Sequence, residues 1–421
     1  MNACISALSL CFALLFMGCA TPYTPLPTLS AELNSATLDE DERYLWKKSS
    51  ELQYEIERSG LLFADPALDA YLGKTLARVT PTELVAAGVE PRVAVISDVR
   101  IHGYSFANGV IYLHTALLSR MKDETQLATV LSRELAHVVN RHALRASREE
   151  KLRADTMAWV GIGASVGGEY GSGVKLLAQA LEISSAVGFP AALETQADKK
   201  GLSVLADAGY DIRGTPEFFQ GTVDYLAEIH TQGPWAWTTF IPPPTMTARI
   251  AGYRKLIQRS DSSPSTNSAG RGERMPAERF RRMLHGVTQR QSELELAAGL
   301  AYTAANTARL ASHSNPNDPK SWYLLGKALE VQRANPIPGK PAPTVEMVRE
   351  ALSKAIQVDS RHADSVRELA MTHYRAPSGT RLPADTAEAT RLFQRYLRLA
   401  PSAGDADYVR SYLEELKAER P

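Results

Sequence analysis

Residues 131–142 read LSRELAHVVNRH, and the interpretation of the whole chain begins from them. Upstream, Asp123 can cap the N-terminus of a helix, and Gln126 stands three positions further on, as in a capping box. Apolar side chains then recur at helical spacing, which predicts a buried helix. Residues four apart on a helix emerge on one face, so we expect Arg133 and His137 to lie one turn apart on the same face.

Two other stretches give this helix a context. Residues 109–113, GVIYL, predict a short strand, and residues 194–198, ETQAD, fall on a later predicted helix. Together the three stretches resemble the zinc metallopeptidase family of the CAAX prenyl endopeptidase and the HtpX heat-shock protease, in its soluble, exported, repeat-bearing bacterial branch. The resemblance covers residues 70–258. It implies an α+β, mainly α fold, with a gluzincin-like metallopeptidase domain that contains a small sheet.

The resemblance also implies roles for four residues. In the family, a helix carries His-Glu-x-x-His, whose histidines bind zinc and whose glutamate activates a water molecule. Carried over to this chain, His137 matches a zinc ligand and Glu134 matches the catalytic base. Glu194 matches the third ligand, and Asp198 matches the carboxylate that orients a ligating histidine.

Arg133 departs from the family pattern, because it stands where the first ligating histidine is expected. A guanidinium stays protonated and offers only donors, so it cannot bind a metal. A positive charge about 4 Å from a dication costs roughly 8 kcal/mol at an effective dielectric constant near 20. Structural zinc sites are worth roughly 10–16 kcal/mol, so this repulsion removes much of the affinity. We therefore expect Arg133 to pair with Glu194, Asp198 or both, and zinc, implied by the resemblance, to be disfavoured.

Other residues offer few replacements for the missing ligand. His142 lies five residues beyond His137, about 140° away from the ligand face unless the helix ends near Asn140. We expect His114 to be a satisfied core or surface histidine. Family members carry His-Pro before a helix such as 247–258, whereas residues 241–244 here read IPPP.

The composition limits the remaining possibilities. With 421 residues the chain exceeds one ordinary domain, so two folded units are expected. Forty-seven basic and forty-seven acidic residues give a formal charge of zero, so nucleic acid is not expected as a partner. Hydrophobic patterning predicts strands at 92–97 and 109–113, and helices at 38–59, 65–79, 192–208, 216–230, 247–258 and 277–312.

The first residues predict an export signal. Residues 5–17 are almost wholly apolar, and Gly18-Cys19-Ala20 follows them, which resembles a bacterial lipoprotein signal with lipidation at Cys19. Plain secretion and an uncleaved anchor remain alternatives. We expect a signal peptide at 1–18, a tether at 19–37 and a lipid-anchored protein in the bacterial envelope, facing the periplasm and attached to the outer membrane. The apolar stretch 157–168 is too short to span a membrane and is expected to belong to the core.

The remaining chain predicts two domains and a linker. We expect a metallopeptidase-like domain at 38–258, a flexible linker at 259–276 and a helical domain at 277–421. Leu325, Leu369 and Leu413 are spaced by 44 residues, since 369 − 325 = 44 and 413 − 369 = 44. With Trp322 and Gly326, they resemble divergent tetratricopeptide repeats, although a generic helical bundle fits the pattern as well.

Three functions remain open on this basis. The first is a catalytically impaired metallopeptidase-like lipoprotein that acts as a protein-binding or quality-control scaffold. The second is an active zinc-dependent metalloendopeptidase that degrades misfolded envelope proteins, and the third is a structural repeat protein with an inert first domain. The expected partners are the membrane, through the lipid anchor, and envelope proteins or unfolded polypeptides. These polypeptides would bind the helical repeats and a sheet edge formed by Val110, Ile111, Tyr112 and Leu113.

Overall fold

The computed structural model describes residues 26–34, 36–153, 176, 189–232, 246–261, 274–375 and 382–418. The predicted signal peptide, Cys19 and the stretches 157–168 and 241–244 lie outside these ranges. None of the described helices is both long enough and apolar enough to cross a bilayer.

The chain folds into many helices and one small sheet, which confirms the predicted fold class. The elements of its first part are α2 (Glu40–Arg58), α3 (Pro66–Arg78), α4 (Thr82–Ala86), β1 (Arg92–Ile96), β2 (Gly103–Ser105), β3 (Val110–His114), α5 (Thr115–Leu118), α6 (Glu124–Val139), α7 (His142–Arg153), α9 (Ala191–Asp207), the 3-10 helix η2 (Ile212–Gly214), α10 (Thr215–His230) and α12 (Met246–Asp261). The later helices are α13 (Ala277–Met283), α14 (His285–Ala297), α15 (Ala301–Ser314), α16 (Pro319–Ala334), α17 (Val345–Val358), α18 (Ala363–Tyr374), α19 (Pro383–Leu399) and α20 (Ala406–Ala418).

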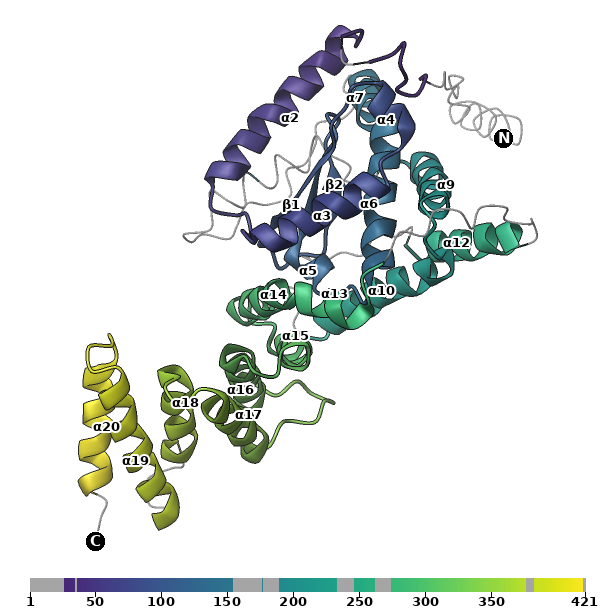
Figure 1. The fold of residues 1–421 in the computed structure, drawn as a ribbon. Helices are drawn as coiled ribbons and strands as arrows, with labels where there is room; N and C mark the ends of the chain where they lie inside the picture. Colours follow the sequence, from purple (N-terminus) through teal and green to yellow (C-terminus); the bar gives the residue numbers. More distant parts are fainter. Residues whose placement is uncertain are drawn as a thin grey trace, which may run out of the picture.

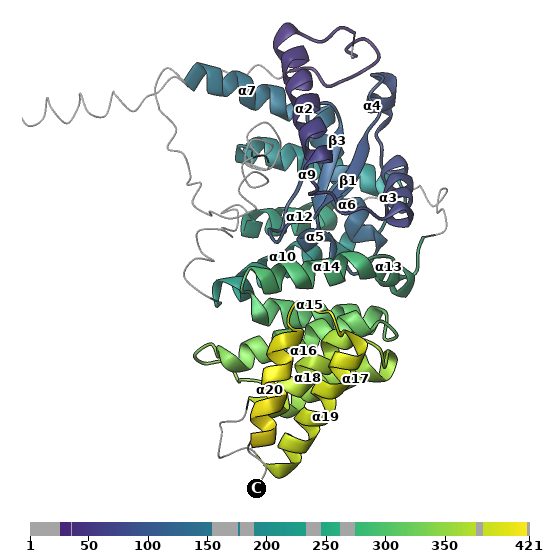
Figure 2. The same ribbon diagram turned by 90° about the vertical axis from the view of Figure 1, so that its left-hand side faces the viewer.

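The sheet has the order β1-β3-β2, with β3 parallel to β1 and antiparallel to β2. Helices α6 and α9 lie on one side of it and α2 on the other (Figures 1 and 2). Because both edges of β3 are already hydrogen-bonded, the prediction of a peptide-binding edge there is wrong. The residues concerned are Val110, Ile111, Tyr112 and Leu113, all buried in the central strand.

Helix α6 is buried along almost its whole length, and its N-terminus is capped as expected. Asp123 accepts a hydrogen bond from the backbone N–H of Gln126 at 3.0 Å, and the Gln126 side chain accepts one from the N–H of Lys122 at 2.8 Å. One flank of α6 packs closely against α9. At Gly201 of α9, an added Cβ would stand 3.0 Å from the Cα of Arg133. Because Gly201 has no Cβ, α9 lies close enough to α6 to contact the Arg133 side chain.

The N-terminal segment packs against the C-terminal end of α6. Leu29 is 1% exposed, and its N–H donates to the carbonyl of Val139 at 3.0 Å. The carbonyl of Leu26 accepts a hydrogen bond from Arg145 at 3.2 Å. This part of the segment assigned to a tether therefore lies on the folded body instead of standing away from it.

Helices α13 and α14 belong to the first core although the sequence analysis grouped them with the helical domain. Phe280, Leu284 and Val287 are buried in the same cluster as the apolar residues of α3 and α6. A separate core begins with α15 and continues through α20. Helix α14 therefore stands between the sheet-bearing part and the row of later helices (Figure 2).

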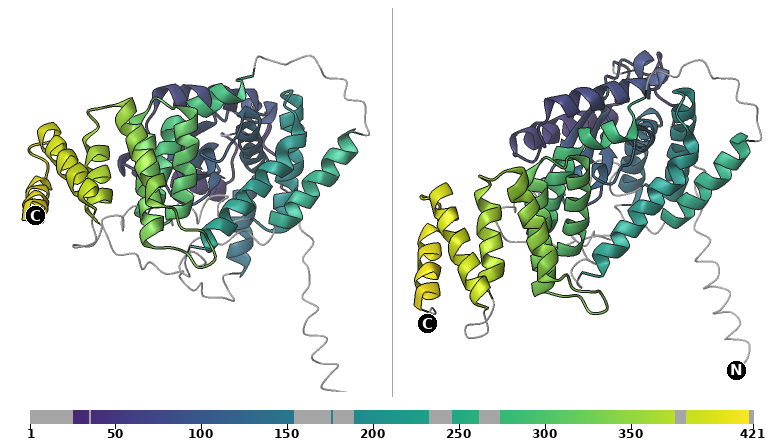
Figure 3. Two further views of the ribbon diagram at one scale, coloured as in Figure 1. Left: turned by 90° about the horizontal axis from the view of Figure 1, so that it is seen from below. Right: turned by 60° about the horizontal axis from the view of Figure 1, so that its bottom comes forward.

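The later helices form a row in which each helix packs against the next along the chain. Figure 3 shows the yellow C-terminal helices at the end of this row farthest from the sheet. The evenly spaced Leu325, Leu369 and Leu413 are buried in α16, α18 and α20. At Gly326 an added Cβ would lie 2.7 Å from the side chain of Leu352, so this glycine allows α16 and α17 to approach closely.

Candidate functional site

The side chain of Arg133 lies among three carboxylates and is only 13% exposed. Its Nη1 donates to Oε1 of Glu134 at 2.7 Å, and its Nε donates to Oδ1 of Asp198 at 3.1 Å. Its Nη2 donates to Oε2 of Glu194. The pairing of Arg133 with Glu194 and Asp198 expected from the sequence is confirmed, and every nitrogen of the guanidinium is engaged.

The same carboxylates accept further hydrogen bonds. Oε2 of Glu134 accepts from the Ser105 hydroxyl at 3.1 Å, and Oε1 of Glu194 accepts from the backbone N–H of Phe189 at 3.0 Å. In each of these two carboxylates, one oxygen therefore accepts a hydrogen bond from Arg133 and the other accepts one from a neutral donor. Ser105 was missed by the sequence analysis because the three-residue strand β2 carries no alternating pattern.

Helix α12 adds a second cation to the site. Arg249 donates to both oxygens of Asp198, at 3.0 and 2.9 Å, and its Nη1 lies 3.8 Å from Oε2 of Glu194. The hydroxyl of Tyr253 donates to Oδ1 of Asp198. Arg249 also lies 4.9 Å above the ring of Phe219, which holds its guanidinium plane in place. Arg249 and Tyr253 were not predicted as site residues, because their positions on a helix do not indicate which distant residues they contact.

The charges of the cluster are nearly balanced. Two guanidinium groups face three carboxylates, which leaves one formal negative charge. Burial works against the charged form of Arg133, but the charges of Glu194, Glu134 and Asp198 hold its pKa well above the usual value. Burial alone would raise the pKa of Asp198, yet Arg133 and Arg249 keep it below the usual value. Arg133 and Asp198 therefore favour their charged forms within this cluster.

His137 lies one helical turn beyond Arg133 and is 3% exposed. Its Nδ1 is 2.9 Å from Nδ1 of His142, and its ring lies 4.9 Å from the ring of Phe189. Its Nε2 is buried and has no hydrogen-bond partner among the residues that the structure describes. Burial and the charge of Arg133 hold the pKa of His137 well below its usual value, so the ring is neutral.

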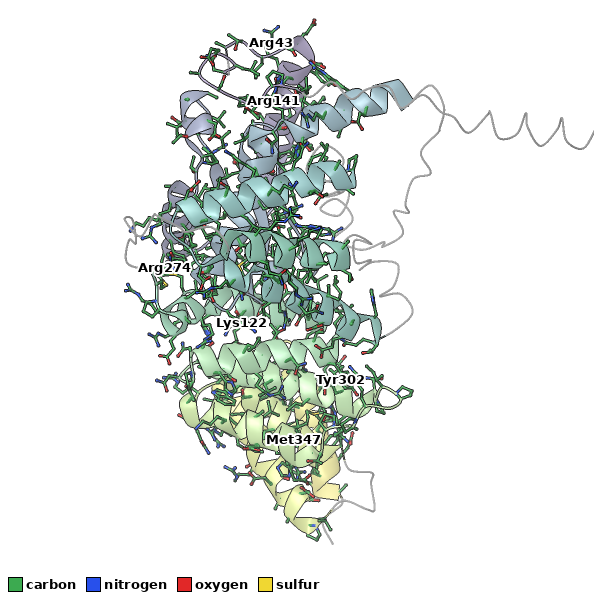
Figure 4. All side chains as sticks on the ribbon, turned by 90° about the vertical axis from the view of Figure 1, so that its right-hand side faces the viewer. Arg43, Lys122, Arg141, Arg274, Tyr302 and Met347 are labelled. Carbon is green, nitrogen blue, oxygen red and sulfur yellow. The ribbon has the colours of Figure 1, made fainter. Side chains whose placement is uncertain are left out.

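His142 reaches His137 because α6 ends earlier than a continuous helix would. The helix stops at Val139, and Arg141 adopts φ of 54° in the left-handed region. Two hydrogen bonds from the Arg141 guanidinium to Glu42 stabilise this unusual backbone. The angle predicted for a continuous helix would have turned His142 away from His137, and the end of α6 at Val139 removes that separation. Figure 4 shows Arg141 at the end of the molecule that also carries Arg43.

A cavity of about 10 Å³ opens beside His137, which is room for about one water molecule. Strand β2, the start of α7 and the segment before α9 contribute to its wall. Its lining includes Ser105, Phe106, Leu144 and Phe189.

The described residues do not fit a zinc ion at this site. The orphaned Nε2 of His137 has the chemistry of a ligand. However, the Arg133 guanidinium bonds to the carboxylates of Glu134, Glu194 and Asp198, where a cation would have to bind. Within the described ranges, no three His, Cys, Asp or Glu side chains are arranged to hold a metal.

The other sequence-predicted residues are placed as follows. His114 is a core residue with no exposure, as expected, and its Nδ1 lies 3.0 Å from the carbonyl oxygen of Arg100. It is not fully satisfied, because its buried Nε2 has no hydrogen-bond partner among the described residues. Glu134, Glu194 and Asp198 come together around Arg133. Their catalytic and ligand roles stay predictions.

Comparison with known proteins supports the family. Residues 66–260 match the family described as peptidase family M48. The chain is 30% identical to the beta-barrel assembly-enhancing protease of Yersinia pestis over 223 residues, which is 51% of this chain and 44% of that protein. It is 28% identical to the protein of the same name from Escherichia coli K12 over 175 residues, covering 40% and 36%.

A third relative comes from a plant. The mitochondrial metalloendopeptidase OMA1 of Arabidopsis thaliana is 26% identical over 137 residues, or 32% of this chain and 26% of that protein. The chain thus spans less than half the length of the curated relatives it matches. The range that matches the family model contains α6, α9 and nearly all of α12, the helices that carry the Arg133 cluster. The match of residues 66–260 to peptidase family M48 and the names of these relatives support a metallopeptidase-like domain in this part of the chain.

Proposed function

We propose that this protein is an M48-family member without catalytic zinc, acting as a protein-binding scaffold in quality control in the bacterial envelope. The observation that carries the proposal is the bonding of the Arg133 guanidinium to all three carboxylates of the site. Arginine occupies the helix position where the family has a ligand, and it satisfies the groups that would otherwise need a metal.

The contacts of Glu134 also support the proposal that it does not act as a base. A general base must be free to accept a proton from a water molecule. Here one oxygen of Glu134 accepts from Arg133 and the other from Ser105. Proton transfer to Glu134 would also remove one member of a buried ion-pair cluster, which is costly.

The helical region supports a binding role. Buried Leu325, Leu369 and Leu413 and the close approach at Gly326 are consistent with divergent tetratricopeptide-like repeats. Rows of helix pairs of this kind offer extended surfaces to polypeptide partners. We propose unfolded or misassembled envelope polypeptides as these partners, and the relatives named beta-barrel assembly-enhancing proteases support the envelope setting. A lipid on Cys19 would attach the protein to the outer membrane.

The alternative is an active zinc-dependent endopeptidase. One observation favours it: Glu134, Glu194 and Asp198 still converge at one site, next to a histidine whose Nε2 has no partner in the described part of the chain. These residues are equally explained by their pairing with Arg133.

Metal analysis and proteolysis assays on the purified full chain distinguish the two functions. We expect the unaltered protein to hold no stoichiometric zinc and to leave casein intact with or without a chelator. The Arg133→His variant should bind about one zinc ion. Arg249→His is the matched control, because it removes a guanidinium from the same cluster without restoring the ligand position. One zinc per unaltered chain, with casein cleavage that a chelator abolishes, would show that the proposal is wrong.

A further inference from the structure

Residues 26–29 are fixed to the body at the C-terminal end of α6. Arg145 donates to the carbonyl of Leu26 at 3.2 Å, and Arg141 donates to the carbonyl of Pro27 at 3.3 Å. The N–H of Leu29 donates to the carbonyl of the last residue of α6 at 3.0 Å, and its side chain is buried in the first core. The chain that precedes Leu26 therefore joins the body at a defined place.

Cys19, the proposed site of lipidation, is close to this place along the chain. It precedes Leu26 by seven residues, since 26 − 19 = 7. An extended chain spans at most about 3.3–3.6 Å per residue, so this connection reaches no farther than about 25 Å. Lipid chains on Cys19 would insert into the bilayer, which would keep the C-terminal end of α6 within that distance of the membrane surface.

The row of later helices joins the body at the other end of α6. Helix α5, which directly precedes α6, contacts the row through the hydrogen bond from Thr115 to Gln291 of α14 at 2.8 Å. The 16 residues of α6 separate the two ends by about 24 Å, at 1.5 Å per residue. Figure 1 shows the row running from there away from α7 and the first described residues. Only the end of the molecule at α2 and α7 is therefore compelled to lie near the lipid.

The surface at this end carries no net charge. Residues 26–47 and the three arginines that bond to them include five acidic and five basic side chains. The acidic ones are Glu32, Asp39, Glu40, Asp41 and Glu42, and the basic ones are Arg43, Lys47, Arg141, Arg145 and Arg148. A layer of anionic headgroups is therefore not repelled by this surface.

An exposed aromatic residue also suits this surface to lipid. Tyr44, in the second turn of α2, is 60% exposed, and the ammonium group of Lys48 lies 5.9 Å from the centre of its ring. Tyrosine is enriched at membrane interfaces, because its ring is apolar and its hydroxyl is polar. Lysine beside it can extend its ammonium group into the headgroup layer.

We propose that the surface formed by residues 26–34 and the first two turns of α2 lies against the lipid headgroups of the membrane that holds the acyl chains of Cys19. The row of later helices then projects away from the membrane, toward the envelope polypeptides proposed as its partners. This inference rests on the lipid proposed for Cys19. It is independent of whether the Arg133 cluster excludes zinc.

Fluorescence quenching of the lipidated full chain in vesicles tests this orientation. The vesicles contain phosphatidylethanolamine and phosphatidylglycerol, with a nitroxide quencher on some headgroups. No cysteine follows Cys19 in the sequence, so one introduced cysteine carries the fluorescent label. A label at Arg43→Cys, on the exposed side of α2, should lose intensity several-fold. A label at Tyr408→Cys on α20, where the native side chain is 65% exposed, should keep its intensity.

Two results would overturn the proposal. Equal quenching at the two positions would mean that the molecule lies flat on the membrane, and stronger quenching at Tyr408→Cys would mean the opposite orientation. Mass spectrometry of the same samples separates this failure from that of the proposed function. Absence of a lipid on Cys19 would overturn the membrane attachment and the orientation together, whereas an unquenched Arg43→Cys label on lipidated protein would overturn the orientation alone.

A longer connection tests why the surface stays near the lipid. Twenty Gly and Ser residues inserted after Thr21 add up to about 70 Å of reach, and they leave the described body unchanged. Quenching of the Arg43→Cys label should then fall several-fold. The same insertion between Ser378 and Gly379 is the matched control and should leave this quenching unchanged, because it does not alter the distance from Cys19 to Leu26. Full quenching after the first insertion would contradict the role of the short connection.

Discussion

At the level of single residues, the guanidinium of Arg133 is not equivalent to a zinc ion, although it lies among carboxylates that could bind a cation. A guanidinium offers a planar set of donors, so it binds carboxylates that lie at its edges. Glu134, Glu194 and Asp198 are arranged in this way, one on each nitrogen of the group. A metal ion would draw ligands around itself from several directions, and the cluster offers no such arrangement. The arrangement of these carboxylates therefore fits the planar donors of a guanidinium.

Removing this guanidinium should destabilise the fold. Arg133→Met leaves buried carboxylates without their central cation, and we expect the free energy of unfolding to fall by about 3–5 kcal/mol. Urea unfolding followed by circular dichroism measures it. The control is Arg213→Met, since the Arg213 side chain is 71% exposed in its pair with Asp211 and its loss should cost less than about 1 kcal/mol. Similar losses in the two variants would contradict this account.

A second prediction concerns His102, whose ring centroid lies 5.5 Å from that of His114. Burial and His114 lower the pKa of His102 to about 3, from the ordinary 6.5 of an unfolded chain. Between these values unfolding takes up a proton, so the free energy of unfolding falls as the pH is lowered, by up to about 1.4 kcal/mol per pH unit. Between pH 7 and pH 5, the free energy of unfolding measured with urea should fall less for His102→Asn than for the unaltered chain. The exposed His313, changed to Asn, should keep the original pH dependence.

At the level of elements, the site depends on how closely α6 and α9 approach. An added Cβ at Gly201 would meet the Cα of Arg133 at 3.0 Å and its backbone nitrogen at 3.1 Å. Both atoms belong to the backbone of a buried helix, so neither can move aside without shifting α6. The glycine therefore fixes the separation at which Arg133 can reach Glu194 and Asp198 on α9.

Gly201→Ala should accordingly destabilise the protein by about 1–3 kcal/mol, because it forces two packed helices apart. Gly221→Ala is the matched control: Gly221 also lies within a helix, α10, but an added Cβ there meets nothing within 4 Å. This control should stabilise the protein by about 0.5–1 kcal/mol through higher helix propensity. Thermal or urea unfolding of both variants checks the prediction, and a stabilising effect of Gly201→Ala would refute it.

The elements also show what the sequence could and could not predict. Helix α6 and its Asp123 cap were predictable, because both depend on residues close together in the chain. The pairing of Arg133 with Glu194 and Asp198 followed from charge and from the family pattern. Arg249 and Tyr253 were missed because their contacts with Asp198 join distant parts of the chain. The central place of β3 was missed because the three-residue β2 gives no strand signal.

At the level of the whole molecule, one buried carboxylate connects the sheet-bearing domain with the row of later helices. Glu295 on α14 is fully buried and accepts hydrogen bonds from Arg120 at 2.8 Å and from Tyr225 at 2.8 Å. Its other oxygen accepts from Thr307 on α15 at 2.6 Å. The two cores are therefore joined by a satisfied polar network as well as by shared helix packing.

Glu295→Ala should loosen this junction. It leaves the buried Arg120 without its carboxylate, and we expect the free energy of unfolding to fall by about 3–5 kcal/mol. Amide hydrogen exchange should rise in α14 and α15 before it rises in α6. Glu293→Ala is the control on the same helix, because Glu293 pairs with the partly exposed Arg290 and Lys320. This variant should lower the free energy of unfolding by less than about 1 kcal/mol. Unchanged exchange in α14 and α15 of the Glu295 variant would show that packing alone joins the two cores.

Arg145 links the start of the described chain to the histidine pair. One of its nitrogens holds the carbonyl of Leu26, and another holds Gln196, which orients His142. Two further contacts hold the same N-terminal segment: Arg141 donates to the carbonyl of Pro27, and Leu29 donates to the carbonyl of Val139 at the end of α6. Tension applied to this segment would therefore be shared between α6 and α7.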